Sequence, residues 1–262
     1  MNRRFEEVTS AEVSRLAAGG DGLAILPVAA IEQHGAHLPL GTDAIIADGM
    51  VETLLPLLPE NWPVTVLPVL RLGRSIEHSD CDGTLDLGWE TMTRMLIETG
   101  EGLARAGFRR LAILSAHGGN TPAMETAALE LRRHLSMLVG TASWQRFGVP
   151  EGLLPPAEVA SGIHGGAVET ALMLHFRPDL VRLDATSRRE SLHDELARSA
   201  RRLTAHGRLG FAWMARDLNP VGTVGDARLA TAAIGAAIAR HQAEGARDYC
   251  RDLLDFDLFR LA

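Results

Sequence analysis

The sequence predicts an α/β fold, a single three-layer α/β/α domain over residues 1–262 with a mostly parallel central sheet. Short apolar runs alternate along the chain with longer segments of helical period, which is typical of strands buried between covering helices. A chain of 262 residues can bury about 70–75% of its unfolded surface in one core, which favours one large domain over two small ones.

Four apolar runs predict the strands of this sheet. The first is 23–28 (LAILPV), and the second is 64–70 (VTVLPVL). Pro68 weakens the second strand or places it near an edge, because proline cannot donate to the ladder. The third and fourth strands are predicted at 109–114 and 138–144.

Six segments have the apolar spacing or the composition of helices. The Gly- and Pro-rich segment 147–163 lies among them and predicts a long loop. The predicted helices are 44–58, 90–106, 121–135, 169–175, 187–209 and 226–254.

The composition excludes several classes of protein. All 26 basic residues are Arg, so Schiff-base enzymes and GK[ST] phosphate loops, which need Lys, are ruled out. The 33 acidic residues give a net charge of -7, which argues against a nucleic-acid partner. Two Cys indicate a reducing compartment, and no run approaches the ~20 apolar residues of a membrane helix. We therefore expect a cytoplasmic protein with no membrane partner.

The densest polar cluster follows the first predicted strand. It contains Glu32, His34, His37 and Asp43 within twelve residues. Side chains at i and i+2 of an extended chain point the same way, so Glu32 and His34 can address one point. Two plainer interpretations stay open: Asp43 stands where a helix begins and would serve as its N-cap, and each His would be structural.

The second cluster, SAHGGN at 115–120, follows the third strand. His117 is therefore delivered to the same sheet edge as the first cluster, where ligands bind in open α/β sheets. Gly118 and Gly119 permit close backbone approach, although a glycine turn before a helix is also a plain anion site.

Two further clusters contain the same residue types. His164 precedes two glycines and a predicted helix that bears Glu169, and Glu169 alone would be an acid favoured by the helix dipole. Glu77 and His78 follow the second strand, and the plainer interpretation is that they are solvated loop residues.

Carboxylates and imidazoles thus recur at several strand ends, and no Cys lies among them. Such ligands suit divalent Zn, Mn, Fe or Co. Two bridged metals need a shared carboxylate, for which Asp43 is the natural candidate. Such a pair polarises a carbonyl and lowers the pKa of bound water toward ~7, which supplies hydroxide at neutral pH. The pattern therefore predicts a metal-assisted hydrolase.

These motifs resemble the creatininase (creatinine amidohydrolase) family. The resemblance rests on EQHGAHLPLGTD at 32–43, SAHGGN at 115–120, HGGAVET at 164–170 and NPVGTVGDARLATAAIG at 219–235. It implies one α/β/α domain, assembly as a homohexamer, and two divalent metal ions per chain (Zn, Mn or Fe). It also implies hydrolysis of a non-peptide C–N bond in a small cyclic amide or formamide.

The resemblance also implies residue roles. The implied ligands are Glu32, Asp43 and His117 for one metal, and His34, Asp43 and Glu169 for the other. By the same resemblance His164 is the acid/base that passes a proton to the leaving nitrogen, and metal-bound hydroxide is the nucleophile. Candidate substrate contacts are Glu77, His78 and Asn120.

Two departures from the family pattern argue against creatinine as the substrate. Creatinine-cleaving members carry a Glu where this chain has Gly119, and they have Trp residues on the loop that corresponds to 147–163, where this chain has none. Other open interpretations are a deformylase acting on a formamidopyrimidine nucleotide, a peptidase that trims a precursor peptide, and a non-catalytic metal-binding protein. An anionic substrate group would be bound by Arg side chains, and Arg71 and Arg74 are the candidates.

Overall fold

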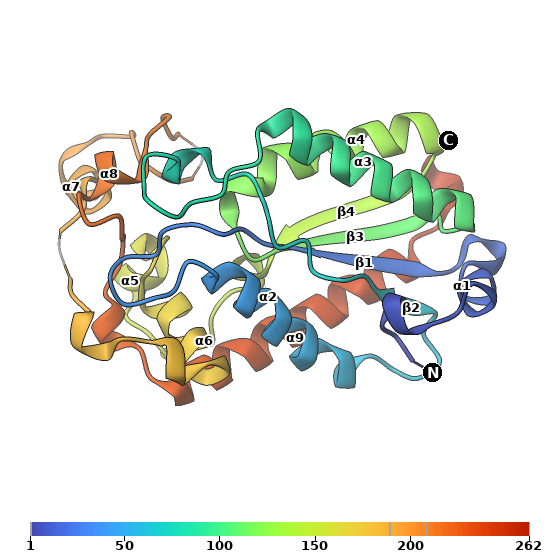
Figure 1. Ribbon diagram of the computed structural model, residues 1–262, viewed down its shortest axis with the longest axis horizontal. Coiled ribbons are helices and arrows are strands. Elements are labelled where there is room, and N and C mark those ends of the chain that lie inside the picture. The colour runs from blue at the N-terminus through green and yellow to red at the C-terminus, as the bar shows by residue number, and fades with distance from the viewer. Residues whose placement is uncertain (1, 189, 208, 262) are drawn as a thin grey trace.

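The computed structural model describes residues 2–188, 190–207 and 209–261, and it confirms the predicted α/β/α fold (Figure 1). Within these ranges four strands form one parallel sheet in the order β2-β1-β3-β4. Successive strands are joined through helices, as parallel pairing requires. The strands are β1 Leu23–Val28, β2 Val64–Val66, β3 Arg110–Ser115 and β4 Leu138–Ser143.

The two central strands, β1 and β3, are buried along their whole length. Their parallel register runs from the pair Leu23–Arg110 to the pair Val28–Ser115. Both strands therefore end at the same level, and the segments that follow them leave from one edge of the sheet.

The edge strand β2 is shorter than the predicted range 64–70. Regular pairing stops at Val66, although the N–H groups of Leu67 and Leu70 still donate to carbonyls of β1. Pro68 lies between them and has no N–H to donate. The prediction that Pro68 marks a weak or edge strand is confirmed.

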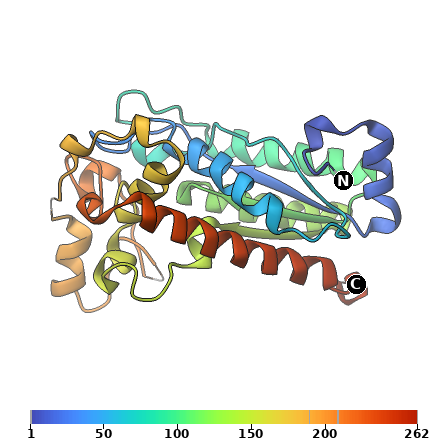
Figure 2. The same cartoon turned by 90° about the horizontal axis from the view of Figure 1, so that it is seen from below.

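Helices cover both faces of the sheet (Figures 1 and 2). Leu23 and Ile25 of β1 point into one apolar cluster, whereas Ala24 and Leu26 point into another, because alternate side chains of a strand face opposite sides. The first cluster is completed by α2 (Thr42–Leu54), α6 (Ala167–Phe176) and α9 (Ala232–Asp255). The second is completed by α1 (Ser10–Leu16), α3 (Trp89–Ala106) and α4 (Thr121–Leu135).

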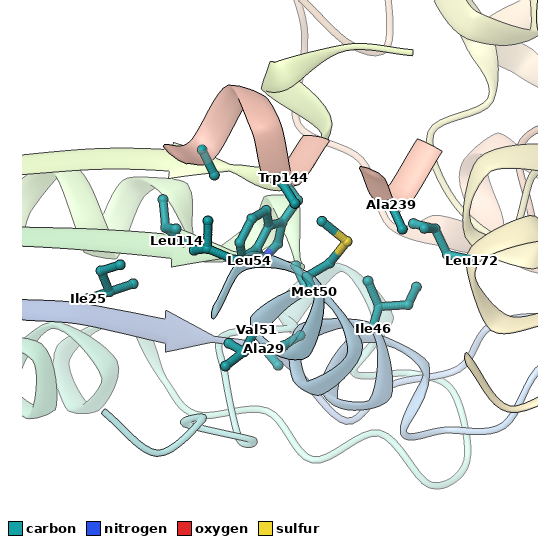
Figure 3. Close-up of a cluster of buried hydrophobic side chains, with 14 of the residues drawn as sticks. Ile25, Ala29, Ile46, Met50, Val51, Leu54, Leu114, Trp144, Leu172 and Ala239 are labelled. Carbon is teal, nitrogen blue, oxygen red and sulfur yellow. The ribbon is translucent and has the colours of Figure 1, made fainter. Parts of the chain in front are cut away.

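The larger cluster anchors the helix that follows the first polar segment (Figure 3). Met50 and Leu54 of α2 are fully buried in the same cluster as Leu114 of β3 and Trp144. Burying one such side chain contributes about 1.5–3 kcal/mol, so the start of α2 is held firmly beside the sheet edge.

The helices in the first half of the chain lie close to their predicted ranges. α4 has the predicted bounds, and α3 begins one residue before the predicted range. The predicted helix 44–58 is too long, because α2 ends at Leu54 and gives way to a 3₁₀ turn. Pro56 causes this change, since it lacks the N–H that would continue the helix.

Two predictions in the second half are corrected, and one short helix was not predicted. The predicted loop 147–163 contains α5 (Pro156–Ser161), whose first position suits proline. The predicted helix 187–209 is helical at α7 (Leu192–Ser199), and its residues 189 and 208 lie outside the described part. A short α8 (Ala215–Leu218) was not predicted.

The predicted helix 226–254 begins later than expected. The side chain of Thr231 accepts a hydrogen bond from Ile234 N and caps α9, which starts at Ala232. Across the described ranges, every helix is too short or too polar to cross a membrane.

Gly235 provides a test of the packing between α6 and α9. A Cβ at this position would collide with the backbone oxygen of Ala171 in α6. We expect Gly235→Ala to lower the free energy of unfolding by roughly 1–3 kcal/mol, because the two helices must separate. Urea unfolding measures this change. Gly102→Ala in α3 is the matched control, because its nearest neighbour is an Arg105 nitrogen at 3.7 Å and alanine favours the helix there. Equal stability of the two variants would contradict the prediction.

Candidate metal centre

A buried cluster of carboxylates and imidazoles lies where β1 and β3 end. Glu32 and His34 come from the segment after β1, and His117 follows β3. Asp43 lies in the first turn of α2, and Glu169 lies in the first turn of α6. Each of the five is at most 6% exposed. The structure therefore brings together all five residues predicted as metal ligands.

Asp43 lies between two groups of ligand atoms. Its Oδ1 is 3.3 Å from His34 Nε2, and its Oδ2 is 3.5 Å from His117 Nδ1. Glu32 Oε1 is 3.2 Å from the same His117 nitrogen, whereas Glu169 Oε2 is 3.8 Å from the His34 nitrogen. The two groups, Glu32–Asp43–His117 and His34–Asp43–Glu169, each have ligand atoms within 4.8 Å of one another. One carboxylate thus presents one oxygen to each group.

The start of α2 places Asp43 inside the helix and not at its cap. Gly41 is the N-cap residue, and the hydroxyl of Thr42 donates to Pro39 O at 2.7 Å. The alternative interpretation of Asp43 as the N-cap is therefore wrong. Its carboxylate is instead directed into the cluster from the first turn, where the helix dipole favours negative charge.

Backbone carbonyls orient the two imidazoles. His34 Nδ1 donates to Glu32 O at 3.1 Å, and His117 Nε2 donates to Arg74 O at 3.0 Å. A carbonyl only accepts, so the donating nitrogen carries the proton in each ring. The other nitrogen, His34 Nε2 or His117 Nδ1, is left to face the carboxylates. This is the arrangement that metal-binding histidines use.

The atoms that face the centre of the cluster fit a bound cation. Among the described residues, Glu32 Oε1, His34 Nε2 and Asp43 Oδ2 are buried without a hydrogen-bond partner. Buried polar atoms are normally paired, since leaving them unpaired is costly. Divalent cations between these nitrogen and oxygen donors would supply the missing partners.

The charges in the cluster depend on one another. Burial opposes ionisation here, but the imidazoles of His117 and His34 hold the pKa of Glu32 well below its usual range. Despite burial, Asp43 and the other carboxylates raise the pKa of His34 to about 10, and Glu32 raises the pKa of His117. Burial raises the pKa of Glu169 to about 7. Metal ions would therefore displace protons when they bind.

His164 lies against the cluster with one free ring nitrogen. Its Nε2 donates to Gln33 O at 2.7 Å, and its Nδ1 is 3.6 Å from Glu32 Oε1. A backbone bridge to Val224 holds the residue in place. Burial, together with positive charge on neighbouring His34, lowers the pKa of His164 well below its usual value. The ring is therefore neutral, and its unprotonated Nδ1 faces the centre.

His78 belongs to the same cluster. It is 2% exposed, its ring centroid is 4.2 Å from that of His164, and its Nε2 is 3.5 Å from Glu32 Oε1. The interpretation of His78 as a solvated loop residue is therefore wrong. Glu77 beside it is largely buried, and its Oε1 is 3.5 Å from His117 Nε2.

Asn120 does not line the cavity at this centre, in contrast to its predicted contact with substrate. It is fully buried, and its amide nitrogen donates to Ala29 O at 3.0 Å and to Ser115 Oγ at 3.3 Å. Its Oδ1 accepts from Arg74 N at 2.9 Å. Asn120 therefore ties the ends of β1 and β3 to the segment that carries His78.

Among the described residues, His37 belongs to none of the ligand groups. It is buried, and its Nε2 is 2.9 Å from Thr170 Oγ1. This contact joins the segment after β1 to α6, which agrees with the plainer interpretation of His37 as a structural residue.

A cavity of about 440 Å³ opens beside the cluster. Glu77, His78, His117, His164 and Glu169 line one part of it. Other lining residues, which the sequence pattern did not single out for the site, are Gln145, Arg146, His206 and Trp213.

The residues missed by the sequence patterns reach the cavity through tertiary contacts. Gln145 follows β4, and its Nε2 donates to Glu169 Oε1 at 3.2 Å. Trp213 donates to Ala205 O at 2.6 Å. Arg74 lines the cavity as expected for an anion contact, whereas Arg71 pairs with Asp48 outside it.

Comparison with known proteins identifies the family. The profile described as creatininase (creatinine amidohydrolase) matches residues 6–250. The chain belongs to the creatininase family. It is 32% identical over 186 residues to the mycofactocin precursor peptide peptidase of Mycobacterium tuberculosis (strain CDC 1551 / Oshkosh), covering 68% of this chain and 67% of that protein. It is 31% identical over 194 residues to the creatinine amidohydrolase of Pseudomonas putida, covering 68% and 73%.

Solved structures support the same fold. A structure described as "Creatininase Mn" superposes with a TM-score of 0.79 at 24% identity and covers 98% of this chain and 100% of its own. A creatinine amidohydrolase (creatininase) crystal structure gives a TM-score of 0.76 at 25% identity, with coverage of 97% and 99%. This creatininase-family protein is therefore a hydrolase with the residues of a metal centre.

Removing the amide of Asn120 tests its part in holding the centre together. We expect Asn120→Ala to lower the free energy of unfolding by about 1–3 kcal/mol, because Arg74 N and Ala29 O lose a buried partner. Urea unfolding measures the loss. Asn2→Ala is the control, since Asn2 pairs with Glu7 on the surface. A loss no larger than that of the control would contradict the role assigned to Asn120.

Proposed function

We propose that this chain hydrolyses an amide C–N bond with the help of two divalent metal ions, with Zn, Mn or Fe as candidates. The observation that carries the proposal is Asp43, whose two oxygens face two separate ligand groups. Ions bound there would supply Lewis acidity, which polarises a carbonyl oxygen and makes water a better nucleophile at neutral pH.

His164 is proposed as the acid/base of this reaction. Gln33 O fixes the proton on Nε2, so Nδ1 is the nitrogen that faces the centre. A neutral imidazole at this place accepts a proton from the attacking water and passes it to the leaving nitrogen. His78 packs on the ring and restricts its rotation.

The substrate proposed first is a small cyclic amide or formamide. The 440 Å³ cavity lies within the range of small-molecule sites. Creatinine is not proposed, because Gly119 and the Trp-free segment 147–163 depart from the pattern of creatinine-cleaving members.

A second candidate function is the trimming of a precursor peptide. Similarity to proteins named mycofactocin precursor peptide peptidase favours it, and in Mycolicibacterium smegmatis the match covers 86% of this chain at 30% identity. The exposed side chains of Gln145 and Arg146 at the cavity also leave an open side through which a chain end could enter.

A substrate panel separates the two candidates. The metal-loaded protein is incubated with formamidopyrimidines, hydantoin-type rings, creatinine and short peptides, and products are followed by mass spectrometry. We expect turnover of a ring or formamide and none of the peptides. Cleavage of peptides alone would establish the second candidate, and no turnover of any kind would favour a non-catalytic metal-binding protein.

Replacement of Asp43 tests the two-metal centre. We expect Asp43→Ala to lose at least one of two bound equivalents, because both ligand groups share this residue. Metal analysis of the purified variant measures the loss. Asp48→Ala, at a partly exposed position further along α2, is the matched control and should keep both equivalents. Two full equivalents in Asp43→Ala would contradict the shared role.

His164→Ala tests proton transfer separately from metal binding. We expect kcat to fall by roughly 10²–10⁴-fold, the usual share of a general acid–base group. We expect both metal equivalents to remain, because His164 is outside the two groups that share Asp43. His164 also lies with Glu32 and His34 in a third possible ligand group, so metal analysis of the variant accompanies the kinetic assay. The kinetic assay uses the substrate found in the panel. An unchanged kcat would remove His164 from the mechanism.

A further inference from the structure

The outer side of the His117 ring has its own environment. Its Nδ1 faces Glu32 and Asp43, and the opposite nitrogen, Nε2, donates to Arg74 O at 3.0 Å. Glu77 Oε1 lies 3.5 Å from the same Nε2. A carboxylate and a carbonyl therefore converge on the one N–H that the ring can offer.

Gly119 makes this arrangement sterically possible. A Cβ at residue 119 would collide with both Glu77 Oε1 and His117 Nε2. Gly118 differs, because a Cβ built there meets no other described atom within 4 Å. The space that a side chain at 119 would need is therefore taken by the Glu77 carboxylate, the His117 ring and Arg74 O.

Arg74 joins the segment that carries Glu77 to the turn that carries His117. Arg74 Nη1 donates to Gly119 O at 2.9 Å and lies 3.7 Å from Glu77 Oε2. The Glu77 side chain is only 15% exposed. Water therefore screens its charge weakly, and the charge acts strongly on the groups that the side chain touches. The carboxylate is thus held against His117 and is not free to turn into solvent.

We propose that Glu77 is a positioning residue for the Glu32–Asp43–His117 group, and that Gly119 provides the space for it. Together with Arg74 O, the carboxylate favours the proton on His117 Nε2 and helps to hold the ring with Nδ1 toward Glu32 and Asp43. Outer partners of this kind contribute 10–100-fold to metal affinity. The inference rests on the two-metal centre of the proposed function, and it gives Glu77 a different role from the substrate contact expected for it.

Metal titration without substrate tests this role. The full-length protein is stripped with a chelator and titrated with Zn²⁺ or Co²⁺ by calorimetry and chelator competition. The Glu77→Gln side chain keeps its shape and loses its charge. In this variant we expect one of the two metal equivalents to bind about 10–100-fold more weakly. The other equivalent, and the urea unfolding of the metal-free protein, should match wild type.

Substitutions at Gly119 and Gly118 provide a second test in the same metal titration. Gly119→Ala should weaken the same equivalent, since the new methyl group displaces Glu77 or the His117 ring, whereas Gly118→Ala should keep wild-type affinity. Glu101→Gln, an exposed carboxylate on α3, controls for loss of charge. If Gly119→Ala does not fold, the Glu77→Gln arm decides alone.

The outcomes separate this inference from the proposed function. Wild-type affinity for both equivalents in Glu77→Gln would overturn the inference, and so would equal weakening of both. A wild-type chain that binds two ions but hydrolyses nothing would overturn the proposed function and leave the inference standing. A wild-type chain that binds fewer than two ions would count against both.

Discussion

The parallel register of β1 and β3 is the constraint on which the metal centre depends. Because Val28 lies opposite Ser115, the chain leaves both strands at one level of the sheet. The segment after β1 carries Glu32, and the segment after β3 carries His117, so the two meet. A shift of one residue in this pairing would turn every side chain of one strand to the other face and separate the two segments.

Another ligand, Glu169, depends on a helix start that is fixed by other contacts. Glu158 of α5 accepts hydrogen bonds from Ala167 N at 2.8 Å and Asp226 N at 2.9 Å, which anchors the first turn of α6. Gly165 N donates to Glu169 Oε2 at 2.6 Å and orients that carboxylate. Glu169 therefore reaches the centre through hydrogen bonds that span the second half of the chain.

The centre gathers three buried carboxylates and several buried imidazoles beside a cavity of about 440 Å³. Glu32 Oε1 alone lies within 3.8 Å of a nitrogen from each of His34, His78, His117 and His164. Burial of so many ionisable groups is costly unless they are paired. Metal ions bound there would pair these charges, and the hydrophobic clusters on both faces of the sheet supply stability that offsets the cost of burying them.

The sequence by itself predicted the alternation of strands and helices, and its resemblance to the creatininase family implied the residues of the two ligand groups. It could do so because apolar runs such as LAILPV and motifs such as SAHGGN are local and carry their own signals. The lengths of the elements were predicted less well. The helix predicted to reach residue 58 ends earlier, because Pro56 cannot continue it. Only the tertiary structure placed Asn120 in the backbone framework and Glu77 against His117, because the first depends on hydrogen bonds and the second on a charged contact between segments distant in the sequence. Gln145 and Trp213 reach the cavity for the same reason, since no spacing in the chain encodes which surfaces the folded sheet brings together.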